Sequence, residues 1–427
     1  MSDPHLMSLP SPGVLVPALP GGGASALKAR LRRAERRQRL RAYALIAPLL
    51  LFVLVSFLLP IGVMLADSVQ DPVVSEVLPR TDALLARLPA KAQVPGEPVF
   101  AALAADMKAA AEAQTASRVA SRLNFEASGL RTLFMKTVRR IAAADAGPWK
   151  EQFVQVDPAW GEPEVWTVLR QTAATPTASY YLAALDLKRD AEDRVVRVPE
   201  GERLYLAVFG RTVALSLMVT LACLAIGYPL AFWLAAKPAK TGNLLMVLVL
   251  LPFWTSLLVR TTAWIVLLQK EGVVNSALLS LGVIREPLDL MFNRFGVVVG
   301  MTHILLPFMI LPLYSVMKQI PPAYVRAARS LGAGPASAFW RVYVPQALPG
   351  VGAGVLLVFI LALGYYITPA LLGGAADQMM SYFIADHLTR SLNWGLASAL
   401  GGLLLAGVLV LYVVYERIVG VGNVRLG

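Results

Sequence analysis

Residues 319–349 read QIPPAYVRAARSLGAGPASAFWRVYVPQALP, and this stretch decides the fold because long apolar runs lie on both sides of it. Two prolines near its start end one helix and begin a turn, since proline cannot donate the hydrogen bond of a helix interior. Residues 323–331 then have the apolar spacing of a short helix. Gly332 and Gly334 break that helix, and 336–343 begins a second one. The stretch predicts an ordered, basic helical hairpin between two membrane spans.

Six apolar segments are long enough to cross a bilayer as helices, which takes about 20 residues. They are 42–66, 206–236, 244–268, 295–317, 348–370 and 394–415. Arg211 and Arg260 are the only charges inside them, and each is expected to extend toward the membrane interface. Of the 427 residues, 57% are apolar and 15% charged, whereas soluble proteins carry about 25% charged residues. The composition excludes an ordinary soluble enzyme and predicts an all-α membrane protein with six transmembrane helices.

Lysine and arginine near the span ends predict the orientation. The segment 28–41 holds eight basic residues and one acidic residue. The loops 237–243 and 318–347 are basic without any acid, whereas 269–294 and 371–393 mix both signs. Both termini are therefore expected in the cytoplasm, with the chain in the inner (plasma) membrane. The net charge of +12 is explained by this bias and predicts contact with the lipid bilayer, with no nucleic-acid partner.

The domain boundaries follow from these runs. The tail 1–41 is rich in Pro, Gly and Ala toward its start and basic toward its end, and we expect it to be disordered. The 25-residue run 42–66 exceeds the 7–15 residues of a signal-peptide core, so it predicts an uncleaved first span. An extracytoplasmic insertion follows at 67–204, the other five spans occupy 205–417, and 418–427 is a short cytoplasmic tail.

The insertion holds 17 basic and 19 acidic side chains, which is typical of a nearly neutral, water-exposed segment. Within it, 99–117 and 129–144 have helical apolar spacing. Two interpretations fit: a small, mostly helical cap with its own aromatic core, or a docking surface or cover for the pathway entrance. The aromatic residues concerned are Trp149, Trp160, Trp166, Tyr180 and Tyr181.

The sequence offers no recognisable enzyme or cofactor site. No G-x-x-x-x-G-K-[ST] phosphate loop occurs, so we expect no ATP site of this type in the chain. One cysteine and three separated histidines supply neither a nucleophilic triad nor a metal centre. The spans lack Asp and Glu, which argues against a proton-driven carrier, and His303 is expected to make a polar contact inside the bundle.

The hairpin contains a motif that resembles the EAA loop of ABC-importer permeases, whose pattern is E-A-A-x3-G-x9-I-x-L-P. Here Arg326-Ala327-Ala328-x-x-x-Gly332 is followed, after nine residues, by Val342-x-Val344-Pro345. The alanines, the glycine and the proline are in place, whereas Arg326 replaces the glutamate. The stretches 251–282, 300–322 and 364–374 are similar to spermidine/putrescine-type permeases, and the resemblance covers about 205–417.

This resemblance implies the type I ABC-importer permease architecture. The chain would form half of the transmembrane pathway, paired with a second permease subunit. Two cytoplasmic ATP-binding subunits would hold the ATP, and an extracytoplasmic substrate-binding protein would deliver the substrate. The residues implied to transmit ATPase motion are Arg326, Ala327, Ala328, Gly332, Val342 and Pro345.

The resemblance also implies a polyamine substrate, putrescine or spermidine, which would interact with carbonyls, carboxylates and aromatic faces. An interfacial or packing role is the alternative for each aromatic residue. Arg260 would face away from a cation, pair with Glu271 or Asp377, or mark an anionic substrate. The candidate pathway residues are Trp254, Arg260, Trp264, Tyr365, Tyr366 and Asp377.

Two alternatives remain open at this stage. The same importer mechanism would also serve an opine, phosphonate, ferric-iron or amino-acid-like solute. In the second alternative, the chain is a membrane-anchored sensor or scaffold whose 67–204 domain binds a ligand. A scaffold would not require a structured hairpin between the fourth and fifth spans.

Overall fold

The computed structural model describes residues 36, 38–39, 42–88, 93–145, 147–173, 176–190 and 194–419. The chain divides into two compact units, 1–63 and 64–427. Most of the predicted tail 1–41 lies outside the described residues, as does the C-terminal tail beyond residue 419.

Among the described residues, five helices are long and apolar enough to cross a membrane, and one bent pair brings the number to six. This confirms the predicted all-α class with six membrane-crossing segments. The bent pair consists of Ala239–Trp254 and Leu257–Ser280. The five single helices are Ala42–Asp67, Tyr205–Ala235, Arg294–Gln319, Pro335–Gly364 and Trp394–Arg417.

The third predicted span, 244–268, is wrong as a single helix. Helix α12 (Ala239–Leu250) passes into a 3-10 turn at Leu251–Trp254, and α13 (Leu257–Leu268) begins beyond it. Pro252 in that turn has no N–H to donate, and the two residues after the turn have extended ψ angles of 148° and 144°. The segment consequently bends by 91°, and α14 (Val273–Ser280) continues it after a short break.

The fifth predicted span, 348–370, is also two helices. Helix α18 (Val344–Gly364) ends where Tyr365 becomes extended, and α19 (Ile367–Leu372) starts two residues later. Pro369 lies in the first turn of α19, where its missing N–H costs little. The break places two consecutive tyrosines between helix ends.

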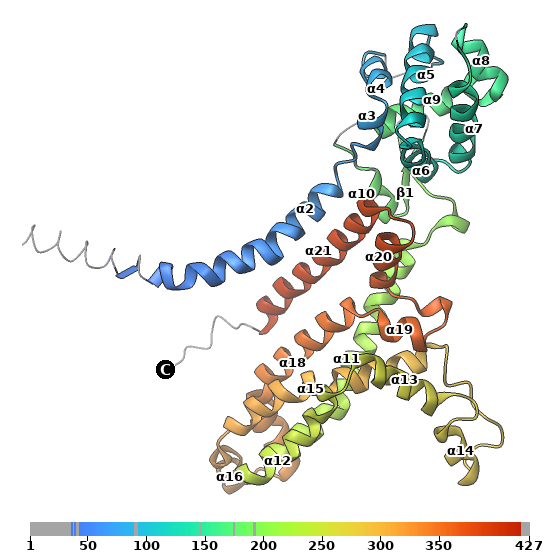
Figure 1. The fold of residues 1–427 in the computed structure, drawn as a ribbon. Helices are drawn as coiled ribbons and strands as arrows, with labels where there is room; N and C mark the ends of the chain where they lie inside the picture. The colour runs from blue at the N-terminus through green and yellow to red at the C-terminus, as the bar shows by residue number, and fades with distance from the viewer. Residues whose placement is uncertain are drawn as a thin grey trace, which may run out of the picture. The chain divides into compact units, whose positions relative to one another are not determined.

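Helices α11 (Tyr205–Ala235), α15 (Arg294–Gln319) and α18 pack against one another and form the core of the membrane part (Figure 1). Small residues allow the close approach. A Cβ atom on Gly354 of α18 would lie 2.8 Å from the Met309 Sδ and 3.2 Å from the Met309 carbonyl oxygen. Gly227 of α11 meets the same methionine, and the buried Cys223 lies in this core. Helices α20 (Met380–Thr389) and α21 (Trp394–Val419) complete the membrane part.

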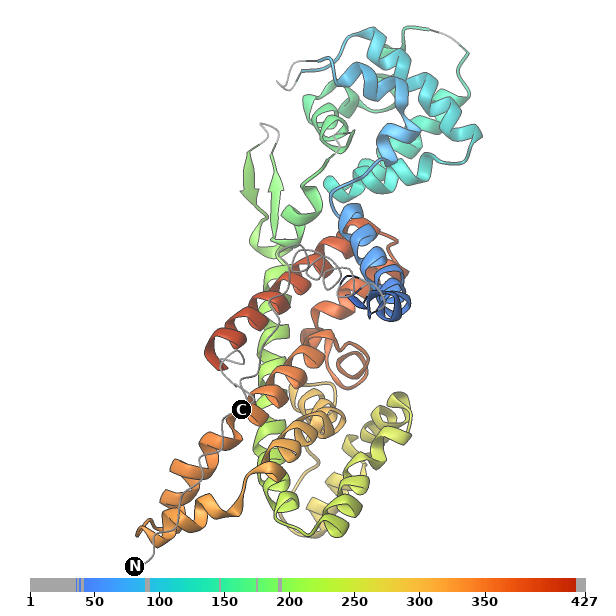
Figure 2. The ribbon, with the colours of Figure 1, turned by 90° about the vertical axis from the view of Figure 1, so that its left-hand side faces the viewer.

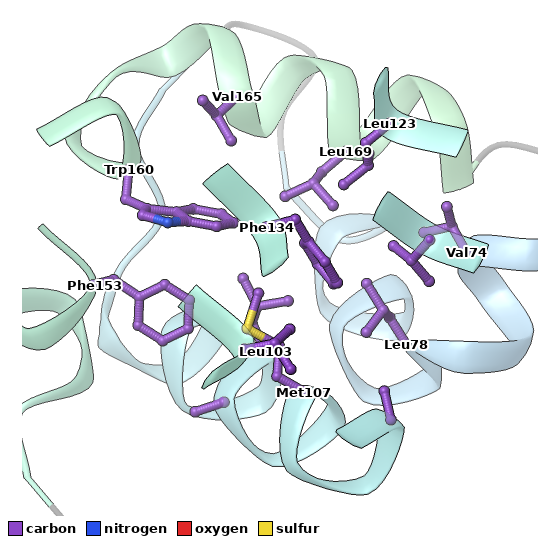
Figure 3. Close-up of a cluster of buried hydrophobic side chains, with 14 of the residues drawn as sticks. Val74, Leu78, Leu103, Met107, Leu123, Phe134, Phe153, Trp160, Val165 and Leu169 are labelled. Carbon is purple, nitrogen blue, oxygen red and sulfur yellow. The ribbon is translucent and has the colours of Figure 1, made fainter. Parts of the chain in front are cut away.

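The insertion is mostly helical and packs around its own core (Figure 3). Phe153 and Trp160 meet edge to face there, with ring centroids 5.1 Å apart. A two-stranded antiparallel hairpin follows the helices and pairs Leu187 with Arg197. The elements are α3 (Val73–Val77), α4 (Pro79–Leu85), α5 (Glu97–Glu112), α6 (Ala116–Glu126), α7 (Leu130–Ala142), α8 (Trp149–Val156), α9 (Pro163–Ala173), α10 (Ser179–Ala184), β1 (Leu187–Arg189) and β2 (Val195–Arg197).

The helix predicted at 129–144 is confirmed by α7, whereas the one predicted at 99–117 ends early. Helix α5 stops at Glu112 because Gln114 adopts a positive φ of 57°, and a new helix starts at Ala116. The predicted aromatic core is confirmed only in part. Trp160 and Trp166 are buried in the insertion, whereas Tyr180 belongs to a cluster with Leu396 and Leu400 of α21.

Candidate functional site

The hairpin predicted at 319–349 is present. Helix α16 (Pro322–Ser330) is followed by a turn, a short helix α17 (Pro335–Ala338) and a π-helical turn at Phe339–Tyr343 that runs into α18. Gly332 in the turn has a φ of +90°, which side-chain-bearing residues rarely adopt. Figures 1 and 2 show the hairpin, in orange, at one end of α15 and α18. The turn therefore depends on glycine at the position that matches the EAA pattern.

The hairpin displays apolar side chains that nothing in the described residues covers. Helix α16 has no buried residue, and Leu331 and Trp340 are 89% and 67% exposed. Such display is typical of a surface that binds another protein. Of the six predicted coupling residues, Ala328 and Val342 are half-buried, and the exposed ones are Arg326, Ala327, Gly332 and Pro345.

The base of the hairpin is fixed to α11. The rings of Phe339 and Tyr343 stack at 5.8 Å, and Phe232 of α11 meets them edge to face at 5.5 and 5.0 Å. On the other arm, Lys318 Nζ donates to the carbonyls of Ala235 (3.1 Å) and Lys237 (2.6 Å) at the end of α11. A cation at a helix C-terminus is favourable because the carbonyl oxygens there carry partial negative charge. The hairpin is thus attached to α11 as well as being continuous with α15 and α18.

A polar cluster inside the membrane part brings together three of the six candidate pathway residues. Trp264 Nε1 on α13 donates to His303 Nδ1 on α15 at 3.1 Å, which confirms the polar contact predicted for His303. The Arg260 guanidinium interacts electrostatically with His303 and with Tyr365 at the α18–α19 break. We call Arg260, Trp264, His303 and Tyr365 the Arg260 cluster.

Arg260 does not have the surroundings expected from the sequence. Its Nε and Nη1 are buried and have no hydrogen-bond partner among the described residues, so these atoms do not extend to the interface. Of the alternatives left open for Arg260, pairing with Asp377 does not occur, because Asp377 is 7% exposed and lies 3.5 Å from Arg294. Among the described residues, Glu271 also forms no ion pair with Arg260. Arg260 is therefore a half-buried positive charge without an ion-pair partner in the described part of this chain.

The remaining candidates do not join the Arg260 cluster. Trp254 is 87% exposed at the end of its 3-10 turn, and Tyr366 is 43% exposed. Asp377 accepts a hydrogen bond from the Gly374 N–H at 3.3 Å and so helps to shape its own turn. No group of three or more His, Cys, Asp or Glu side chains suited to a metal occurs within the described ranges.

A buried charged network that the sequence did not predict joins the insertion to the membrane part. Asp71 pairs with Arg122 of α6 and accepts a hydrogen bond from the Tyr180 hydroxyl at 2.5 Å. Burial raises the pKa of Tyr180 above its ordinary value of 10.0, and the Asp71 charge acts in the same direction. The Tyr180 ring lies so close to Gly395 of α21 that any Cβ there would overlap it. The spacing of residues in the sequence does not predict this network, because its members lie far apart in the chain.

Asp186 makes a second connection between the insertion and the membrane part. It is 5% exposed, and its carboxylate accepts hydrogen bonds from the N–H groups of Leu204, Tyr205 and Leu206 at 2.9–3.0 Å. The first N–H groups of a helix have no partner inside the helix, so the carboxylate caps α11. The sequence did not predict this cap, because Asp186 lies 18–20 residues before the N–H groups that it accepts.

The hairpin and the Arg260 cluster both lie in the part of the chain that is similar to known proteins. The profile of a family described as "Binding-protein-dependent transport system inner membrane component" matches residues 227–420. The spermidine/putrescine transport system permease protein PotB of Escherichia coli is 38% identical over 196 residues, which are 46% of this chain and 71% of that protein. PotB of Haemophilus influenzae is 38% identical over 214 residues, 50% of this chain and 75% of that protein.

A more distant relative belongs to a transport system for a different substrate. The molybdenum transport system permease protein ModB of Azotobacter vinelandii is 28% identical over 215 residues, 49% of this chain and 93% of that protein. The family profile begins after the insertion, which therefore lies outside it.

Proposed function

We propose that this chain, which belongs to the family of binding-protein-dependent transport system inner membrane components, conducts a polyamine across the membrane. It is a permease subunit of an ATP-binding-cassette importer and a multi-pass inner-membrane protein. The observation that carries the substrate class is the 38% identity to PotB over more than two thirds of that protein. Putrescine and spermidine are the substrates to test first.

In this proposal the chain forms half of the pathway, and a second permease subunit forms the other half. Two ATP-binding subunits hold the ATP on the cytoplasmic side, and a substrate-binding protein docks on the opposite side. The basic loops at 237–243 and 318–347 support a cytoplasmic location for both termini and for the hairpin.

The hairpin is the proposed contact with the ATP-binding subunits. Its exposed Leu331 and Trp340 supply apolar surface, and its aromatic base at Phe339 and Tyr343 is packed on α11. ATP binding would draw the hairpin with the ATPases and so change the relative populations of inward- and outward-facing states. Coupling of this kind needs a hairpin of fixed shape, which explains the glycine at the φ of +90°.

The coupling role is tested by comparing two glycines of the same turn. Gly332→Val forces a β-branched residue into a positive φ, and we expect uptake to fall at least about fivefold at unchanged membrane abundance. Gly334→Ala is the matched control, because Gly334 has an ordinary φ of −64° and open space around its Cα. Equal uptake by the two variants, each in complex with its ATPases, would remove the hairpin from the mechanism.

The substrate is tested by uptake of labelled putrescine and spermidine into cells with and without the gene. We expect uptake to require the gene and to be competed by unlabelled polyamines, but not by amino acids, opines or phosphonates. Polyamine uptake that persists without the gene would contradict the proposal.

An anionic substrate is the second candidate, and Arg260 is the observation that favours it. Its half-buried guanidinium, which has no ion-pair partner among the described residues, would suit an anion better than a polyamine, and the relative ModB is a permease of a molybdenum transport system. Competition by anionic solutes in the same assay, with no effect of polyamines, would support this candidate.

A further inference from the structure

The hairpin between α15 and α18 carries positive charge that it does not balance itself. Residues 318–347 contain Lys318, Arg326, Arg329 and Arg341 and no Asp or Glu. The three arginines are exposed, and no ion pair among the described residues involves any of them. The hairpin therefore presents a basic surface to whatever lies against it.

Two of these cations have a role within the chain, but Arg326 does not. Lys318 donates to the carbonyls at the end of α11, and Arg329 lies in the last turn of α16, where a cation is favourable. Arg326 lies in the middle of the same helix, three residues before Arg329. Like charges at this spacing repel each other, so Arg326 does not stabilise α16. A contact outside the chain would explain its charge.

The surroundings of Arg326 suit a protein partner. Tyr324 and Leu331 are seven residues apart, which is two helical turns, so they share one face of α16. They are 53% and 89% exposed, and the small, exposed Ala327 separates this face from Arg326. Arginine and exposed aromatic side chains are enriched among the residues that dominate protein interfaces. One partner surface can therefore contact the apolar face and the guanidinium together.

We infer that the ATP-binding subunit presents a carboxylate to Arg326. The inference rests on the proposed function, in which the hairpin contacts that subunit. A carboxylate is the best match because its two oxygens accept from the parallel N–H donors of arginine. The turn at Gly332, with its φ of +90°, holds Leu331 in a fixed relation to Arg326. A protein groove recognises such a fixed spacing, whereas mobile lipid headgroups do not require it.

The sign of this charge makes Arg326 a specificity-determining residue. The E-A-A pattern that the hairpin matches has a glutamate at this position, and this chain has the opposite charge. A surface that is complementary to glutamate is not complementary to arginine, because specificity arises from mismatched charges as well as from matched ones. This chain should therefore select ATP-binding subunits that have the carboxylate and reject those that lack it.

The test uses the complete complex of both permeases and the ATP-binding subunits in phosphatidylcholine nanodiscs. p-Benzoylphenylalanine in place of Trp340, on the other arm of the hairpin, should cross-link this chain to an ATP-binding subunit on illumination. Arg326→Glu should lower the yield at least about fivefold, because two carboxylates then face each other, and Arg326→Gln should lower it less. Arg285→Glu is the control, because Arg285 is also exposed but precedes α15, whereas the hairpin follows it.

Two further measurements distinguish an ionic contact from a change in the fold. Salt raised from about 0.1 M to about 1 M should reduce the wild-type yield more than that of Arg326→Gln, because it screens exposed charges. Each surface Asp or Glu of the ATP-binding subunit is then changed to Lys. One such change should restore cross-linking to Arg326→Glu, with clear non-additivity in a double-mutant cycle. Cys223 should remain protected from maleimide in every variant.

Three results would overturn the inference. The first is an unchanged cross-link in Arg326→Glu, and the second is the absence of any Lys change that rescues it. The third is an effect of Arg326→Glu that appears only when phosphatidylglycerol is added to the nanodiscs, which would assign Arg326 to anionic lipid. In each case the wild-type cross-link would still stand. Absence of that cross-link would instead contradict the proposed contact of the hairpin, so the two failures are distinguishable.

Discussion

The insertion and the core formed by α11, α15 and α18 bury side chains according to different rules. In the insertion, α7 places Leu133 and Phe134 inside and leaves Arg139 and Arg140 outside. On α11, apolar residues occupy both the buried and the exposed face of the helix. Leu215 is fully buried, whereas Leu217 is 49% exposed.

The hydrophobic effect explains the pattern in the insertion, because burial of apolar side chains away from water is favourable. Lipid does not distinguish between apolar faces, so close contacts decide which face of a span is buried. The glycines that meet Met309 mark the buried face of the membrane core. Apolar periodicity therefore locates the core of the insertion but not that of the membrane part.

The largest expected effect is in the insertion. Trp160 is 1% exposed, and its indole N–H donates to Thr137 Oγ1 at 2.8 Å. Trp160→Ala should lower the free energy of unfolding of the insertion by about 3–5 kcal/mol, because it leaves a cavity and removes the hydrogen bond to the Thr137 hydroxyl. Hydrogen exchange measured by mass spectrometry on the full chain should show faster exchange within 73–173 only, the range that shares this core.

The matched control for this change is Trp340→Ala. Trp340 is 67% exposed on the hairpin, and its removal should change stability by less than about 0.5 kcal/mol. If Trp160→Ala also accelerated exchange throughout α15 and α18, the insertion and the membrane core would unfold together. The two regions would then not have independent cores.

An intermediate effect is expected in the membrane core. Gly354→Leu inserts a side chain where a Cβ alone would lie 2.8 Å from Met309 Sδ, and overpacking of this kind costs about 1–3 kcal/mol. Cys223 is the chain's single cysteine and is buried in the same core. Its rate of maleimide labelling in detergent should therefore rise in this variant.

Gly210→Ala is the appropriate control. Gly210 is inside α11, and a Cβ atom added to it would meet no other atom within 4 Å, so alanine should slow Cys223 labelling or leave it unchanged. Unchanged labelling in Gly354→Leu as well would mean that glycine contacts do not define the membrane core.

The smallest effect concerns the network that joins the two regions. Because burial raises the pKa of Tyr180 above 10.0, the unfolded chain loses this proton before the folded chain does. Stability should consequently fall above about pH 10, by at most about 1.4 kcal/mol per pH unit for this group. Below pH 10 the hydroxyl is protonated in both states and adds no slope.

Thermal unfolding from pH 8 to pH 11 measures this slope, and Tyr180→Phe should make it shallower. The other tyrosines are unchanged, so the difference between the two chains isolates Tyr180. Parallel curves for the two chains would show that Tyr180 does not hold its proton more tightly in the folded state.

The sequence predicted the class, the number of spans and the hairpin, because these depend on local composition and spacing. The run lengths predicted six crossings, and the Pro-Gly punctuation predicted α16, the turn at Gly332 and the following helix. The 91° bend was missed because one proline inside an apolar run is compatible with both a straight and a broken span.

The candidate site was predicted less completely. Trp264, Arg260 and Tyr365 were chosen separately, and in the structure Trp264 bonds to His303 while Arg260 interacts with both His303 and Tyr365. Asp377 was one of the possible partners considered for Arg260, but it pairs with Arg294. Such pairings depend on how α13, α15 and α19 pack, and helix packing is not encoded in the spacing of a single segment.

The cap that Asp186 forms on α11 also has a consequence for biosynthesis. Asp186 precedes the N–H groups that it accepts by 18–20 residues, so it leaves the ribosome before them. The nascent chain therefore already contains the acceptor for the first turn of α11 when that helix enters the membrane. A shortened chain that lacks the insertion would need to provide a new acceptor at this point, even if every membrane helix were retained.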